Sequence, residues 1–466
     1  MENTARENRM GTAPIGKLLI SMSAPLMASM LVQALYNVVD SIFVSRISEK
    51  ALTALSLSFP IQNLMIAVAT GTGVGINALL SRSLGEKKFD RANKAAENGL
   101  MLALFSYLAF LAVGLTCIRP FFQSQTQDEE IIYHGVRYLS ICSAVSFGLF
   151  GQVTLERILQ ATGKSFETMI SQMSGAIFNI IFDPLLIFGI GPFPELGSAG
   201  AAIATVGGQI LAMFVALYFN RTRNEDVHLK LKGFRPDGYI VRRIYIVGVP
   251  SIAMASIGSI MIYGINRILL SFVATAATVY GVYFKLQSFV FMPVFGLNNG
   301  MVPVVAYNYG ARRKDRIMKA YRTGILIAEC IMVAGMLIVF IFPEQLLRMF
   351  KASDQMLEIG VPALRIICVH FPIAAFCIVT GSVFQALGNG FLSLIVSVCR
   401  QLLVLLPVAY LLSLSGDLNK VWLAFPIAEV MSLLISSICM RWIYRKEIQP
   451  LGAPVEGRKE SVNGNA

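Results

Sequence analysis

The chain has 466 residues, of which 55% are hydrophobic and only 14% are charged, and its mean hydropathy is +0.65. Soluble proteins carry about 25% charged residues, so this is not the composition of a soluble protein. Apolar runs of about 20 residues recur along the chain, and each is long enough to cross about 30 Å of hydrocarbon. The composition predicts an all-α polytopic membrane protein, because an outer-membrane barrel would show short alternating segments instead. The net charge of +12 is attributed to basic cytoplasmic loops and not to nucleic-acid binding.

The apolar runs predict twelve membrane spans, over residues 16–45, 52–81, 95–118, 133–161, 165–190, 198–220, 239–273, 277–307, 317–343, 356–386, 391–414 and 420–443. Prolines inside these runs are expected to kink the helices, at Pro25, Pro60, Pro250, Pro293 and Pro372.

Lys and Arg collect before the first span, after spans 2, 6 and 8, and after the last span, whereas the alternate loops carry few. This bias predicts that both termini face the cytoplasm. Residues 1–17 show no cleavable signal pattern, and residues 451–466 are predicted to be a disordered tail. We therefore expect a multi-pass protein of the inner (cytoplasmic) membrane.

The first span carries a polar face at Gln33, Tyr36, Asn37 and Asp40. The spacing i, i+3, i+4, i+7 places these side chains on one side of a helix. A carboxylate at membrane depth costs roughly 2.5–3.5 kcal/mol unless it faces protein or water. The face is therefore expected to line the bundle interior.

A second acid lies in the fifth span, where Asn179 and Asp183 are one helical turn apart. Residues at i and i+4 are neighbours on one helix face, and Gln172 extends the same face by two further turns. We expect this stretch to meet the polar face of the first span in one cation site.

The chain repeats itself with an offset of 225 residues. Gly85–Ala95 and Gly310–Ala320 share five of eleven residues, and the same offset pairs Pro25 with Pro250. Matching basic loops then lie on the same side of the membrane, so the repeat is parallel. It predicts an N-lobe over 1–225 and a C-lobe over 226–450, each with six spans, around a midplane site.

These features together resemble the multidrug and toxic compound extrusion (MATE) transporters, in particular the DinF-like and MepA-like branch. The resemblance covers nearly the whole chain: twelve spans, the duplication, the Pro25…Asp40 pattern, Gln-Ala-Thr-Gly at 160–163 and Gly-Ala-Ala-Ile-Ala-Thr at 200–205. It implies two six-helix lobes that rock about a central cavity. It also implies proton- or sodium-driven export of lipophilic, often cationic compounds.

Carried onto this chain, the family's cation site falls on Asp40, Asn179, Asp183 and Thr205. The resemblance also implies that Gln33 and Tyr36 line the substrate cavity and that Glu156 takes part in transport. From their places on the same polar helix faces or inside the membrane, we add further candidates for the substrate cavity or for gating: Asn37, Gln152, Gln172, Lys285 and Arg400. The counterparts of Asp40 and Asp183 in the C-half are not acidic, which argues for a cation site in the N-lobe alone.

The chemistry of such a site admits two occupants. Two nearby carboxylates in a low dielectric do not both stay ionised without a cation, and they titrate as a unit. Proton and sodium are therefore alternative coupling ions. No other cofactor is expected, and no other metal site.

Several residues keep a structural alternative. Glu156 could form a salt bridge with the adjacent Arg157, and Glu429 could pair with Arg400 or Lys285. The role of Arg267 is left open. For Lys285, Arg400 and Glu429, a role in gating or substrate contact is left open beside the pairing. His134 and His370 have no ligand-spaced partners.

The function we expect is secondary active multidrug export by a monomer. The first alternative is a lipid-linked oligosaccharide flippase of a related fold. An integral-membrane enzyme is not predicted, because no convergent nucleophile or metal set is found. A channel fits less well than a transporter with alternating access, because the halves are duplicated and carry prolines.

Overall fold

The structure is a computed structural model and describes residues 8–45, 48–229 and 234–452. Every regular element among these residues is a helix. The first half of the chain forms α1 (Arg9–Thr12), α2 (Ile15–Ser45), α3 (Glu49–Gly85), α4 (Phe89–Thr116), α5 (Ile118–Gln125), α6 (Glu129–Ala144), α7 (Phe147–Ala161), α8 (Ser165–Phe188) and α9 (Ser198–Thr222).

The second half forms α10 (Gly238–Leu270), α11 (Ala274–Gly310), α12 (Lys314–Ile341), α13 (Pro343–Arg348), α14 (Asp354–Cys368), α15 (Phe371–Ala386), α16 (Gly390–Val398), the π-helical η1 (Cys399–Leu405), α17 (Leu406–Ser413), α18 (Leu418–Trp422), α19 (Ala424–Ile443), η2 (Tyr444–Ile448) and η3 (Gln449–Gly452).

Ten segments among the described residues are long and apolar enough to cross a membrane, and two bent helix pairs bring the number to twelve. The chain is thus a multi-pass membrane protein with the predicted span number. The fourth and tenth predicted spans are not continuous helices, because α6 and α7 meet at 45° and α14 and α15 meet at 47°. By contrast, α2, α3, α10 and α11 continue through their internal prolines.

Local sequence sets several helix ends. The carboxylates of Asp128 and Asp237 accept hydrogen bonds from the first free backbone N–H groups of α6 and α10, which lack partners within the helix. Ser353 caps α14 in the same way. Gly189 ends α8 with a φ of +67°, a conformation that glycine adopts without steric cost.

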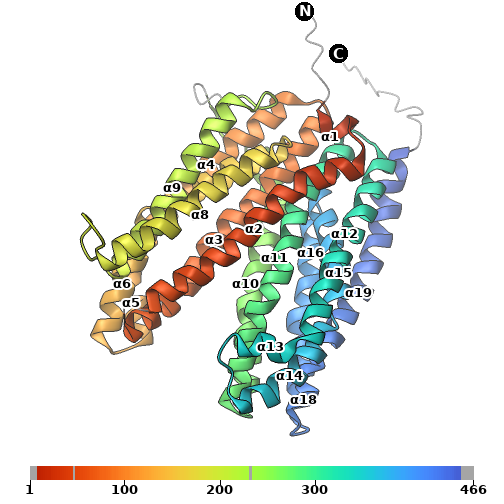
Figure 1. The fold of residues 1–466 in the computed structure, drawn as a ribbon. Helices are drawn as coiled ribbons and strands as arrows, with labels where there is room; N and C mark the ends of the chain where they lie inside the picture. The colour runs from red at the N-terminus through yellow and green to blue at the C-terminus, as the bar shows by residue number, and fades with distance from the viewer. Residues whose placement is uncertain (1–7, 46–47, 230–233, 453–466) are drawn as a thin grey trace, which may run out of the picture.

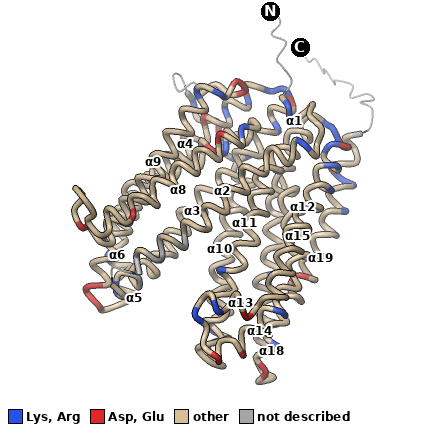
Figure 2. The backbone as a smooth tube through the Cα atoms, viewed as in Figure 1, with Lys and Arg blue, Asp and Glu red and all other residues tan. Residues whose placement is uncertain are grey.

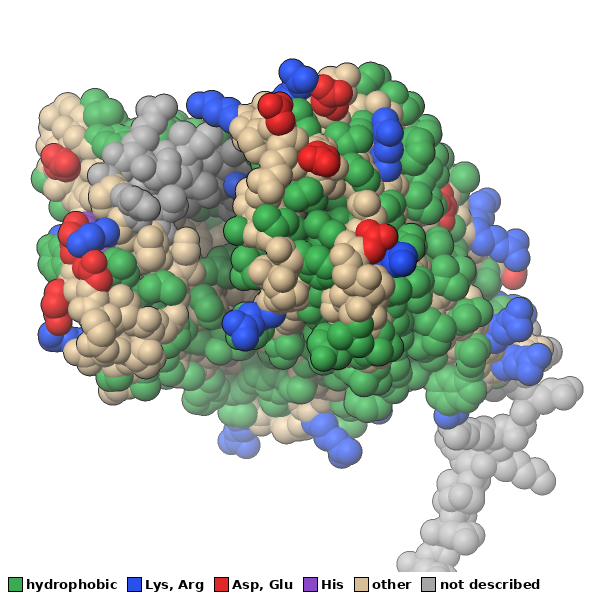
Figure 3. Space-filling view, turned by 90° about the horizontal axis from the view of Figure 1, so that it is seen from below, with side chains coloured by type: hydrophobic (Ala, Val, Ile, Leu, Met, Phe, Trp, Pro, Cys, Tyr) green, Lys and Arg blue, Asp and Glu red, His purple; other side chains and the backbone are tan. Residues whose placement is uncertain are grey.

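The helices form two groups, α2–α9 and α10–α19 (Figure 1). The groups pack together near α1 and η3, which we call the proximal end, and diverge toward the opposite, distal end (Figure 1). Figure 3 views the distal end and shows a surface hollowed between the two halves. Lys and Arg gather at the proximal end (Figure 2).

The backbone repeats with the offset seen in the sequence. Lys87 and Arg312 both have a φ of +58°, and Gly163 and Gly388 have φ values of +86° and +89°. Each pair is separated by 225 residues, so equivalent loops in the two halves share an unusual conformation. The division of the chain into lobes at residue 225 stays a prediction.

The two halves approach most closely at glycines. A Cβ added to Gly71 of α3 would lie 2.8 Å from the backbone nitrogen of Ile252 in α10. A Cβ added to Gly296 of α11 would lie 2.6 Å from the Cα of Met27 in α2. The two contacts are related by the same offset, so the interface between the halves is itself pseudo-symmetric.

The largest buried apolar cluster lies mainly in the second half and continues across this interface. It includes Leu19 and Met22 of α2 and Ile76 and Leu80 of α3, all fully enclosed. The hydrophobic packing that joins the halves is therefore concentrated toward the proximal end.

Candidate functional site

The structure brings together three of the four predicted coupling residues. Asp183 and Asn179 of α8 are buried, with exposed fractions of 0% and 3%, and Thr205 of α9 lies beside them. The Asn179 amide satisfies its neighbours when Nδ2 donates to Asp183 Oδ2 at 2.6 Å. Its oxygen then accepts from the backbone N–H and the hydroxyl of Thr205, at 3.0 and 3.3 Å. The result is a compact oxygen-rich cluster around a buried carboxylate.

The fourth residue, Asp40, belongs to α2, but its side chain lies outside the described part of the structure, as does that of Asn37. Gln33 is exposed and Tyr36 is half-buried. The meeting of Asp40 with Asp183 therefore stays a prediction at the level of side chains.

The backbone shows at what height along their helices Asp40 and Asp183 lie. Ser29 Oγ of α2 contacts Gln172 Oε1 of α8 at 2.5 Å, and both helices begin near α1 at the proximal end (Figure 1). Asp40 and Asp183 each lie eleven residues beyond this contact, or about 16 Å along the helix axis. The two acids therefore stand at similar heights on neighbouring helices that run in the same direction.

A second buried carboxylate, Glu156 of α7, is 4% exposed. Its Oε1 accepts hydrogen bonds from Gln152 Nε2 and Ser171 Oγ, and its Oε2 accepts one from Gln172 Nε2, each at 2.9 Å. Arg157 does not form the salt bridge considered as an alternative, because it donates instead to Gln160 and to Asn299 of α11, each at 2.9 Å.

The two clusters share helix α8, on which Gln172 precedes Asn179 by seven residues, or about 10 Å. Ser29 and Ser171 were not predicted as site residues. Ser29 could have been found, because it precedes Gln33 by four residues and so extends the polar face of the first span. Ser171 carries no comparable signal in the sequence.

A third polar cluster lies in the second half. Arg400 Nη1 of η1 donates to Glu429 Oε2 of α19 at 3.2 Å, so the predicted pairing of Glu429 with Arg400 is confirmed. His370 lies 3.9 Å from the same carboxylate oxygen through Nδ1, and its Nε2 is 3.1 Å from the hydroxyl of Tyr283. Lys285 is exposed on α11 and takes no part in this pairing.

His370, which has no ligand-spaced partner in the sequence, lies near Glu429 in the structure. It is 4% exposed and lies at the break between α14 and α15. The break coincides with the kink predicted at Pro372, which lies in the first turn of α15. The approach of the His370 ring to Glu429 was not visible in the sequence, because Glu429 lies on a different helix.

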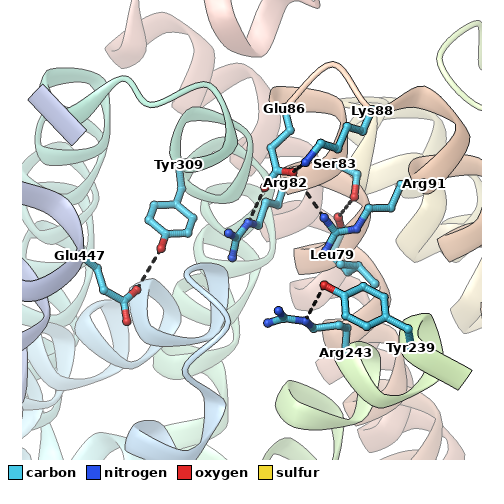
Figure 4. A network of polar contacts seen from close by, with 10 residues as sticks. All are labelled: Leu79, Arg82, Ser83, Glu86, Lys88, Arg91, Tyr239, Arg243, Tyr309 and Glu447. Carbon is cyan, nitrogen blue, oxygen red and sulfur yellow. Dashed lines mark hydrogen bonds and ion pairs between the residues drawn. The ribbon is translucent and has the colours of Figure 1, made fainter. Parts of the chain in front are cut away.

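Charged residues close the proximal end (Figure 4). Glu86 accepts hydrogen bonds from Arg82 at 2.8 Å, Lys88 at 2.9 Å and Arg91 at 3.3 Å. Partial burial opposes ionisation of Glu86, but the hydrogen bonds from Lys88 and Arg82 outweigh it and lower the pKa of Glu86. Arg82 also lies 4.7 Å from the ring centre of Tyr309 in the other half. The network therefore joins the two halves through a cation–π contact.

The segment around α1 bridges the halves at the same end. Asn8 donates to Asp226 Oδ2 at 2.8 Å, and burial raises the pKa of the Asp226 carboxyl. On the other side, Arg316 of α12 donates to the carbonyls of Met10 and Ala13 at 3.0 and 2.8 Å.

The sequence matches the profile of the MatE family over residues 25–185 and 247–411. The chain belongs to the MatE family. Within the described residues, no three His, Cys, Asp or Glu side chains are grouped as a metal site would need.

Two relatives illustrate the range of the family. The FAD transporter of Shewanella oneidensis is 26% identical over 451 residues, which cover 95% of this chain and 97% of that protein. The multidrug export protein MepA of Staphylococcus haemolyticus is 25% identical over 411 residues, or 88% and 89% of the two chains.

Solved structures agree over nearly the whole chain. One, described as the outward-facing conformation of a multidrug resistance MATE family transporter of the MOP superfamily, has a TM-score of 0.90 and 26% identity and covers 97% and 99% of the two chains. A MATE protein in complex with MaL6 gives a TM-score of 0.89 at 26% identity and covers 96% and 99%. The MATE fold of twelve transmembrane helices in two lobes is therefore that of this chain.

Proposed function

We propose that this protein is a secondary active multidrug exporter, in which proton or sodium antiport drives lipophilic, often cationic compounds out of the cytoplasm. The observation that carries the proposal is the buried Asn179–Asp183–Thr205 cluster inside a MATE fold. A buried carboxylate that is paired with neutral donors is a group whose charge can be changed by a small cation.

In the proposed mechanism, Asp183 and Asp40 share a proton or bind a sodium ion. Neutralising the pair relieves the cost of two buried charges and lets α2 bend at Pro25, which changes the shape of the cavity. Substrate then leaves to the exterior, and a cationic substrate favours the deprotonated form on the inward side. A ligand shifts such an equilibrium only through its different affinity for the two states.

The arrangement of the halves supports alternating access. Glycine contacts, the Glu86 network and the α1 segment all close the proximal end, while the halves diverge distally (Figure 1). With both termini in the cytoplasm, as the basic loops favour, this is an outward-facing state. Release of the proximal contacts would produce the inward-facing state.

We further propose that the protein resides in the inner membrane of a bacterial-type cell, acts as a monomer and uses no cofactor besides H⁺ or Na⁺. The bias of Lys and Arg toward the proximal end supports the orientation (Figure 2). Labelling of single cysteines in intact cells tests it, because only distal positions should react with an impermeant reagent.

The decisive experiment is efflux from proteoliposomes under an imposed proton gradient and, separately, a sodium gradient. Efflux by the wild-type protein should respond to at least one gradient. The Asp183→Asn and Asp40→Asn variants should each show a gradient-driven efflux rate at least about tenfold lower than that of the wild type. Asp354→Asn is the matched control, because Asp354 is exposed on α14, and it should keep the full rate.

No response to either gradient, or full driven export by both site variants, would contradict the proposal. The relatives are named for different substrates, a drug set and FAD, so the assay compares a cationic dye with FAD. Export of the dye supports the proposed charge preference, and export of FAD alone would refute it.

A further inference from the structure

The second half contains an open cavity of about 330 Å³ that lies among α10, α11, α15, η1 and α19. Aromatic side chains form much of its wall, including Tyr280, Phe291 and Phe425. The Tyr280 and Phe425 rings lie 5.9 Å apart, and the His370 ring stacks on Phe425 at 6.4 Å. The volume is within the usual range for small-molecule pockets, and the rings offer flat faces to a planar ligand.

Arg400 supplies the accessible charge of this cavity. It lines the wall, and its side chain is 29% exposed. Over the described residues, its single hydrogen bond is the one from Nη1 to Glu429. Its Nε and Nη2 atoms are not fully enclosed, so one edge of the guanidinium fork remains available to a ligand.

The counter-charge lies behind Arg400. The side chain of Glu429 is only 4% exposed, and its Oε1 is enclosed without a hydrogen-bond partner among the described residues. His370 approaches the same carboxylate but leaves a gap of 3.9 Å. A ligand in the cavity therefore meets the cation first and the carboxylate second.

The backbone at Arg400 is also unusual. Cys399–Leu405 is a π-helical segment within an α-helical span, and such segments are rare and often occur at functional sites. The equivalent span of the first half, α8, is α-helical from Ser165 to Phe188. The wider turn and the charge at Arg400 therefore distinguish the second half from its repeat.

We propose that this cavity binds planar aromatic anions, with a carboxylate or similar group on the free edge of Arg400 and the ring against Phe425 and its neighbours. Arginine binds such groups through two parallel N–H donors. The anion competes with Glu429 for the guanidinium, so binding partly separates the ion pair.

This site is distinct from the Asp183 cluster, and it does not rest on the proposed coupling ion. Binding is measured at equilibrium without any gradient, so failure of driven export leaves the result intact. Conversely, failure of anion binding leaves the antiport proposal untouched.

The test uses the full-length protein in lipid nanodiscs and two ligands with the same ring. 2-Naphthoate carries the carboxylate, and 2-naphthamide is its neutral counterpart. Titration calorimetry, corrected with empty nanodiscs, should show naphthoate binding at least about tenfold tighter than the amide.

Substitutions assign that preference to Arg400. Arg400→Gln should abolish it, and Arg400→Lys should keep part of it. Glu429→Gln should strengthen naphthoate binding, because the competitor for the guanidinium is removed. Arg267→Gln is the matched control, since Arg267 is exposed in the same half, and it should behave like the wild-type protein.

Equal binding of the two ligands to the wild-type protein would overturn the proposal, as would an unchanged preference in Arg400→Gln. Weaker naphthoate binding by well-folded Glu429→Gln would also overturn it, because that result would make the ion pair purely structural. Melting curves of each variant identify well-folded protein before the titrations.

Discussion

At the scale of single residues, the buried carboxylates differ in what surrounds them. Asp183 is held by Asn179 beside Thr205, and Glu156 by two amides and a hydroxyl. The amide and hydroxyl donors in these two clusters are neutral, and they stabilise an anion without neutralising it. Glu86 is surrounded by three cations at the proximal end. Asp183 and Glu156 are therefore suited to gaining and losing charge, whereas Glu86 is suited to staying ionised.

We predict that Glu86→Gln lowers stability in a pH-dependent manner. The folded protein lowers the pKa of Glu86 below its ordinary value of 4.5. The carboxylate therefore stabilises the fold fully above about pH 4.5, and its contribution is lost as the pH falls through the lowered pKa. At pH 7 the variant should lose about 1–3 kcal/mol of unfolding free energy.

Melting curves in detergent at several pH values measure this effect. The difference between wild type and variant should be largest at neutral pH and should shrink below pH 4.5. Glu344→Gln serves as the control, because its pair with Arg348 is exposed and contributes little. A difference that did not depend on pH would contradict the assignment.

At the scale of helices, close packing decides how the halves meet. Gly71 and Gly296 let α3 and α11 approach the backbones of α10 and α2. A side chain at either position would clash with backbone atoms, which cannot move away by changing rotamer as a flexible side chain can. The helices must then separate or shift.

We predict that Gly296→Ala weakens the closed proximal end and favours the state with a closed distal end. Spin labels at Glu130 and Ser271, which are exposed in different halves, report the distal separation by double electron–electron resonance. The variant should increase the population at short distance.

Gly281→Ala provides the comparison on the same helix. A Cβ at Gly281 meets nothing within 4 Å, so this variant should leave the distances unchanged and stabilise α11 slightly. Identical distance distributions for the two variants would rule out a conformational role for Gly296.

At the scale of the whole molecule, the α1 segment links parts that are distant in the chain. Asn8 ties it to the carbonyl of Thr162 in the first half and to Asp226 in the linker between α9 and α10, and Arg316 ties it to the second half. These hydrogen bonds can form only while the two halves are in contact at the proximal end. It therefore belongs to the outward-facing state of the proposed cycle.

We predict that Arg316→Gln loosens this bridge, because it removes charged donors to the carbonyls of Met10 and Ala13. Hydrogen exchange of the peptide covering residues 8–22 should be several-fold faster at equal stability. Arg322→Gln, at an exposed position of the same helix, should exchange as the wild type does. Unchanged exchange in Arg316→Gln would show that the contact does not hold the segment.

The sequence alone was sufficient to predict the membrane class, the twelve spans and the repeat. Hydropathy and charge bias are local properties of the chain, and they determine directly which segments enter a bilayer and which loops stay in the cytoplasm. The sequence also placed Asn179 beside Asp183, since residues one turn apart on a helix are always neighbours. Thr205 was included through the family resemblance, and the structure places it beside Asn179.

Only the tertiary structure decided the partners across helices. Arg157 donates to Asn299 and not to Glu156, and His370 lies near Glu429. Arg400 lies in a π-helical turn at the wall of a cavity. These contacts depend on packing between segments that are distant in the chain. Such packing produces no periodic pattern in the sequence, because its geometry is set by how closely whole helices approach one another.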